Sequence, residues 1–238
     1  MVSDSKAKAE NRTHPKRFYK VAAAENGRIL LDGRELKTQG RKPLAIASPV
    51  LAEAVAAEWQ AAQTHINPER MPLTRLVNIS IDRAGADRDA LIATMVDYAG
   101  TDLLCYRAPD IAQWQATLFD PVLQWAAGQG IMLQTTDGIM PIAQPQASLE
   151  AVAALLAPAS DAEITALAMM VPLLGSTVLA LAIWKRELSV EAAMQMARLD
   201  ETKQAEHWGV DEDSEAAWAY KKADILASAF FLTHNALN

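Results

Sequence analysis

The residues best suited to chemistry lie in one short stretch, which reads Leu199-Asp-Glu-Thr-Lys-Gln-Ala-Glu-His-Trp-Gly209. The stretch ends a helical pattern that opens near Ser189, a residue type that caps helices. Counting 3.6 residues per turn from the start of that helix places Glu201 on the same side as Met194 and Trp208. An unpaired carboxylate on a buried face is costly. We therefore expect Glu201 to have a partner, to stay protonated, or to border a groove that another molecule fills.

Three interpretations of this acid remain open. Glu201 and His207 could form an acid-base pair of a small-molecule enzyme, which would require a deep pocket that holds both groups within hydrogen-bond reach. Glu201 could instead form an internal ion pair with an arginine or lysine. It could also contact a partner protein.

Other reactive groups give no comparable pattern. Cys105 stands between Leu104 and Tyr106, so we expect a buried, unreactive thiol. The sequence has no glycine-rich phosphate loop, and we expect no nucleotide and no cofactor. The histidines are not paired at the spacing of metal ligands, so we expect no metal site; they are His14, His65, His207 and His234.

Composition narrows the class of protein. The chain has 238 residues, a formal net charge of −7 and one cysteine. The negative charge argues against nucleic acid as a partner, and the single cysteine suits a reducing compartment. The N-terminus lacks the apolar segment of a secretory signal, and Asp4 and Glu10 are unfavourable in a mitochondrial transit peptide. We expect a cytoplasmic protein.

The predicted secondary structure begins with short apolar segments near the N-terminus. Asn26-Gly27 and Asp32-Gly33 are strong hairpin signals, because both central turn positions need positive φ. They predict a three-stranded meander with strands at 17–21, 28–31 and 34–38. Helices follow, and residues 102–107 read as a strand that returns to this sheet.

The second half of the chain is expected to be helical after one more hairpin, at 131–134 and 139–142. Residues 164–184 carry no charge. Because Pro172 and Gly175 interrupt this run, we expect a buried helical hairpin without membrane insertion. The predicted fold class is α+β: a disordered tail at 1–15, an N-terminal β-containing domain at 16–145 whose boundary falls within 108–147, and a C-terminal helical bundle at 146–238.

A set of short motifs appears in an ordered series along residues 16 to 215. They are Arg17-Phe-Tyr-Lys20, Leu31-Asp-Gly-Arg34, Glu58-Trp59, Ile66-Asn-Pro68, Met71-Pro-Leu-Thr74, Ile81-Asp82, Asp97-Tyr98, Thr101–Arg107, Asp120-Pro121, Gly138-Ile139, Leu174-Gly-Ser176, Leu199-Asp-Glu201, Gln204 and Trp208-Gly209. The series resembles the assembly chaperone family of the F-type ATP synthase that binds the free α subunit of the catalytic sector.

This resemblance implies a two-part fold without enzymatic activity and without nucleotide. With its short, non-targeting N-terminus the chain resembles a bacterial member of the family, and the resemblance implies the mitochondrial matrix if the source is eukaryotic. It also implies that an acid in the Leu-Asp-Glu…Trp-Gly region matters for function, with Glu201 the first match and Asp200 the second. Tryptophan is enriched at protein interfaces. The expected partner-binding residues are Glu201, Asp200, Gln204, Trp208 and Trp59.

The expected function is to hold the unassembled α subunit and to shield its β-facing surface until the β subunit displaces the chaperone. The alternatives are the Glu201/His207 enzyme and a permanent structural subunit of a complex.

Overall fold

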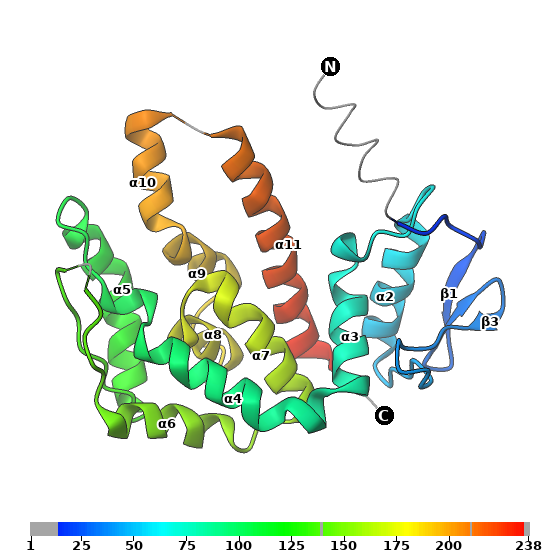
Figure 1. The fold of residues 1–238 in the computed structure, drawn as a ribbon, viewed down its shortest axis with the longest axis horizontal. Coiled ribbons are helices and arrows are strands. Elements are labelled where there is room, and N and C mark those ends of the chain that lie inside the picture. Colours follow the sequence, from blue (N-terminus) through cyan, green and yellow to red (C-terminus); the bar gives the residue numbers. More distant parts are fainter. Residues whose placement is uncertain (1–13, 139, 210, 236–238) are drawn as a thin grey trace. The chain divides into compact units, whose positions relative to one another are not determined.

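The computed structural model describes residues 14–138, 140–209 and 211–235, and its ribbon is mostly helical with a small sheet near the N-terminus (Figure 1). This confirms the α+β class. In chain order the elements are β1 (Ala22–Glu25), β2 (Arg28–Leu31), β3 (Arg34–Glu35), α2 (Pro49–Ala61), η1 (Pro68–Arg70), α3 (Pro72–Asp82), α4 (Ala84–Gly100), η2 (Leu103–Cys105), α5 (Ala112–Gly128), α6 (Gln146–Leu156), α7 (Asp161–Leu174), α8 (Thr177–Trp184), α9 (Val190–Ala197), α10 (Leu199–Trp208) and α11 (Glu212–His234).

The chain forms two compact units. Among the described residues, unit 1 comprises 14–83 together with 233–235, and unit 2 comprises the rest. The sequence placed the boundary within 108–147, whereas the division falls between Arg83 and Ala84. The physical reason is that α4 packs against α6 and α7, so the middle of the chain shares a core with the C-terminal helices.

The meander of unit 1 is antiparallel with strand order β1-β2-β3. Asn26 and Gly27 have φ of 50° and 74°, and Asp32 and Gly33 have φ of 48° and 78°. These values are what the two hairpin turns require. The first strand occupies 22–25 and not 17–21, because a two-residue turn pairs the residues that directly flank it, here Glu25 with Arg28.

Glu58 connects the helices of unit 1. It lies on α2, and its carboxylate accepts hydrogen bonds of 2.8 Å from the backbone amides of Leu73 and Thr74, in the first turn of α3. The Thr74 hydroxyl donates a third, at 2.7 Å. Burial raises the pKa of this carboxyl, and the hydrogen bonds oppose that rise. The acid therefore caps α3 and fixes it to α2.

The core of unit 2 is built around α7 and α8. Ser160 and Glu163 form a capping box at the start of α7, and Gly175 ends it with φ of 66°. Nearly every residue of α8 is buried. The uncharged run is therefore a buried helical pair, as the sequence predicted. In the part of the chain that the structure describes, no helix combines the length and apolar character that crossing a membrane requires.

Two strand predictions in this region are wrong. Residues 103–105 form a 3₁₀ turn inside unit 2, because the buried carboxylate of Asp102 accepts hydrogen bonds from the amides of Leu104 (3.1 Å) and Val178 (3.0 Å). The described residues of the expected hairpin at 131–142 contain no strand pair, and Ile139 lies outside them. Thr136 instead forms an isolated parallel bridge with Tyr106.

Candidate functional site

The helix expected to run from Ser189 to Gly209 is divided at Arg198. This residue has φ of −113° and ψ of 11°, which separates α9 from α10. The break changes the phase of the helix, so a count from the start of α9 no longer gives the buried face of α10. As a result Glu201 is exposed, with 52% of its side chain accessible. The prediction of a buried carboxylate at position 201 is wrong for this reason.

Arg198 is the ion-pair centre at this break. Its Nε donates to Glu201 Oε2 at 3.3 Å, and both of its Nη atoms donate to Glu215 on α11. The guanidinium also lies 5.2 Å from the ring centroid of Trp218. The hydrogen bonds to Glu215 raise the pKa of Arg198 and lower the pKa of Glu215. Arg198 thus joins α10 to α11, and Glu201 is an exposed member of this network.

Asp200 has a different environment from its neighbour. Its Oδ1 accepts a hydrogen bond of 2.9 Å from Nε2 of Gln115 on α5. Gln115 is 2% exposed, and its Oε1 accepts a bond of 2.7 Å from the amide of Ala108. The second match of the sequence motif, and not the first, therefore connects α10 to the interior of unit 2.

An exposed aromatic side chain lies beside α10. Trp114 on α5 is 51% exposed, and Nζ of Lys203 on α10 lies 3.3 Å from its ring centroid. Lys203 also donates to both carboxylate oxygens of Glu206, at 2.9 and 3.0 Å. Leu118, one turn after Trp114, is exposed as well. We use the name α5–α10 surface for six residues of these two helices: the exposed Trp114, Leu118, Glu201, Gln204 and Glu206, together with the partly buried Lys203.

The side chains of this surface are suited to protein binding. Carboxylates, a half-exposed indole and an exposed leucine can orient and bind another polypeptide. The described residues contain no cluster of three or more side chains suited to a metal ion. Cys105 is buried as expected, and burial raises the pKa of its thiol to about 12. The side chains of His207 and Trp208 lie outside the described part of the structure.

Trp59, the remaining predicted partner-binding residue, belongs to unit 1. Its ring is half-buried, and its centroid lies 5.8 Å from that of Tyr19. The Tyr19 hydroxyl donates a 2.6 Å hydrogen bond to the Trp59 carbonyl. The predicted residues therefore divide into a group on α10 and one tryptophan in the N-terminal unit.

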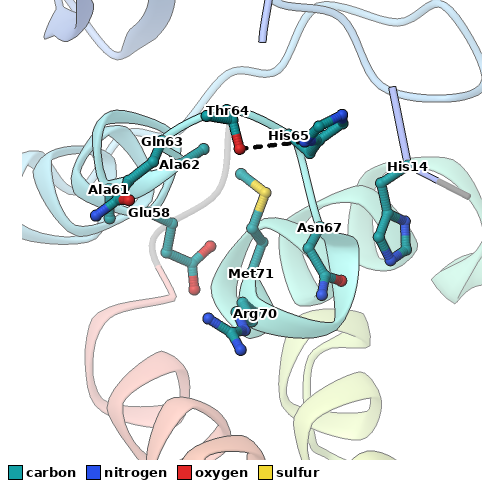
Figure 2. A pocket seen from close by; sticks show the side chains of 10 residues that line it. All are labelled: His14, Glu58, Ala61, Ala62, Gln63, Thr64, His65, Asn67, Arg70 and Met71. Carbon is teal, nitrogen blue, oxygen red and sulfur yellow. Dashed lines mark hydrogen bonds between the residues drawn. The ribbon is translucent and has the colours of Figure 1, made fainter. Parts of the chain in front are cut away.

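Unit 1 also contains a polar pocket of about 440 Å³ that the sequence did not indicate (Figure 2). Glu58, Arg70 and Met71 face it, and His65 lies at its edge with its ring 3.1 Å from the Thr64 hydroxyl. The Glu58 carboxylate already accepts three hydrogen bonds from α3. Its position here is explained by helix capping.

Sequence reasoning missed Arg198, Gln115 and Trp114. A single arginine between two helical segments gives no sign of which acids it will bind. Gln115 is separated from Asp200 by 85 positions. Only Trp114 had a usable signal, as one of six tryptophans in the chain.

Comparison with known proteins assigns the fold. The model of the ATP12 chaperone protein family matches residues 16–127. Atp12 from Paracoccus denitrificans has 38% sequence identity and a TM-score of 0.79, over 92% of this chain and 97% of that one. An aspartate-to-lysine variant of the same protein gives the same values. A candidate chaperone from Agrobacterium tumefaciens has 36% identity and a TM-score of 0.84, over 93% of this chain and 86% of that one.

The fold is thus that of a class of chaperones. The chain belongs to the ATP12 chaperone family, the family of ATP synthase assembly chaperones that its ordered motifs resemble.

Proposed function

We propose that this protein binds the unassembled α subunit of the ATP synthase catalytic sector and covers its β-facing surface until the β subunit displaces it. An unassembled subunit exposes apolar area that promotes self-association. Competition by β releases the chaperone without ATP, provided that β binds the same surface more strongly. Membership of the ATP12 family over nearly the whole chain supports this proposal.

The main structural support for this proposal is the exposed side chain of Trp114, which lies beside the acidic helix α10. Trp114 and Leu118 supply exposed apolar area on α5, and Glu201 and Gln204 supply exposed polar groups on α10. Apolar area contributes affinity, while charge sets orientation and the association rate. Asp200 has a supporting role, because its hydrogen bond to Gln115 holds α10 against α5.

Co-expression with the α subunit tests the proposal. We expect α to remain soluble and to co-purify with the wild-type protein, and to aggregate without it. If α aggregates to the same extent in both cases and does not co-purify, the proposal is wrong.

Variants locate the binding surface. We expect Glu201→Lys and Trp114→Ala to reduce recovery of the complex about tenfold or more, as hot-spot residues do. Glu150→Lys on α6 is the matched control for charge, and Met132→Ala is the control for exposed apolar area. If the controls reduce recovery as strongly as the test variants, the α5–α10 surface is not the binding site.

Mass spectrometry of the assembled synthase separates a chaperone from a permanent subunit. We expect this protein to be absent from the purified enzyme. Its presence in a fixed ratio to the other subunits would identify it as a structural component.

A further inference from the structure

A groove of about 430 Å³ lies in unit 1 and has no role in the function described so far. It is formed by the segment after β3, by α2 and by α3. Its apolar lining includes Leu36, Trp59, Ile66, Met71 and Ile79. A groove of this size can take a few residues of an extended chain.

Two lining side chains carry polar atoms whose hydrogen-bonding capacity is unused. The indole Nε1 of Trp59 and the Oδ1 of Asn78 are shielded from solvent and have no hydrogen-bond partner among the described residues. The other end of the Asn78 amide donates to the Thr74 carbonyl at 2.8 Å, which fixes its orientation. Buried polar groups are nearly always paired in proteins. One donor and one acceptor match the carbonyl and the N–H of a peptide backbone.

The charge around the groove favours an acidic occupant. Lys37, Arg75 and Arg83 line it, while the lining carboxylate of Asp82 accepts hydrogen bonds from the Thr38 hydroxyl and from the Gly40 amide. Residues 14–83 contain eleven lysines and arginines against seven aspartates and glutamates, a formal charge of +4, although the whole chain carries −7. This unit is therefore a basic region of an acidic protein, and its field attracts negative segments.

We propose that this groove binds an extended segment of the client polypeptide in which an acidic side chain is next to an apolar one. Side chains that line the groove move when the segment binds and uncover both atoms. Trp59 Nε1 then donates to a main-chain carbonyl of the segment, and Asn78 Oδ1 accepts from a main-chain N–H. The apolar side chain enters the groove, and the carboxylate lies toward Lys37. The inference depends on the proposed function only in taking the α subunit as the client.

Nuclear magnetic resonance on the full-length protein tests the groove without the α subunit. The probe is an acidic pentapeptide of alternating leucine and glutamate, and the control is the same peptide with lysine in place of glutamate. We expect the acidic peptide to shift the indole N–H signal of Trp59 and the side-chain amide signals of Asn78, and the lysine peptide to leave them unchanged. If neither peptide shifts these signals at about 1 mM, a concentration that populates even weak complexes, the proposal is overturned.

Binding of the purified α subunit supplies the second test. Trp59→Phe keeps an aromatic ring but removes the donor, and we expect affinity for α to fall about fivefold, the effect of one lost hydrogen bond. Trp125→Phe, the same change at a half-buried site of unit 2, is the control. Equal affinity of Trp59→Phe and wild type would overturn the proposal.

Two charge-reversal variants test whether the groove prefers acidic segments. Lys37→Glu should weaken binding of α and of the acidic peptide, whereas Arg34→Glu, an equal change outside the groove, should not. Equal effects would contradict a local role for Lys37. If wild type does not bind α at all, the proposed function fails, and the peptide experiment still decides the groove.

Discussion

Asp200 on α10 and the buried Gln115 on α5 are joined by a hydrogen bond of 2.9 Å. Gln115 is otherwise held by the amide of Ala108, so the bond connects an exposed helix to a fixed point in unit 2. The adjacent acid, Glu201, is exposed and pairs with Arg198. Two neighbouring carboxylates therefore have separate environments: one is bonded to the interior of unit 2, and the other is exposed.

The Gln115 contact predicts a stability loss. Gln115→Leu removes the partner of Asp200 and leaves the partly buried amide of Ala108 without an acceptor, so we expect the free energy of unfolding to fall by about 1–3 kcal/mol. Urea denaturation measures it. Gln113→Leu, at an exposed position of the same helix, should change stability by less than about 0.5 kcal/mol. If both variants lose the same stability, the hydrogen bonds of the Gln115 side chain make no specific contribution to it.

The exposed position of Glu201 predicts a variant that folds normally. Glu201→Gln breaks an exposed i,i+3 ion pair, and such pairs contribute about 0–1 kcal/mol. We expect thermal unfolding close to that of wild type, together with weaker binding of the α subunit. A loss of several kcal/mol would instead indicate a buried structural ion pair and would contradict the exposure seen here.

Arg198 should matter more for stability than either acid it binds. Its side chain is 18% exposed and joins α10 to both Glu215 and the Trp218 ring. Arg198→Met keeps most of the aliphatic packing and removes the charge. We expect α10 to separate from α11, observed as faster amide hydrogen exchange across residues 199–206. Unchanged exchange there would show that other contacts hold the helix.

Asp102 predicts a pH dependence of stability. Burial raises its pKa from 3.8 to about 6, although the Ser176 side chain and backbone amides donate to it. The folded state therefore binds more protons than the unfolded state between these values. This contribution to the free energy of unfolding is fully present below pH 4, falls as pH rises through 6, and is lost above that.

Comparison of wild type with Asp102→Asn checks this prediction. The free energy of unfolding of wild type minus that of the variant should fall by on the order of 1–3 kcal/mol between pH 4 and pH 7, because the variant lacks the titrating carboxyl group. Parallel stability curves would refute the assignment to Asp102.

The features that the sequence determined by itself are those set by neighbouring residues. Asn26-Gly27 and Asp32-Gly33 fixed the hairpin turns, since few other residue pairs adopt positive φ at both positions. Ser160 and Glu163 fixed the start of α7 for a similar reason, because a capping box spans only four residues. The ordered motifs also identified the family, since they extend along nearly the whole chain.

The position of Glu201 was decided by tertiary structure. A helix count assumes that the phase continues, but the phase changes at Arg198, whose side chain bonds Glu215 on another helix. Likewise the sequence around Asp102 predicted a strand, whereas in the structure the amide of Val178, 76 positions away, donates to the Asp102 carboxylate. Hydrogen bonds between distant segments leave no periodic pattern in the sequence. They can be assigned only once the chain has folded.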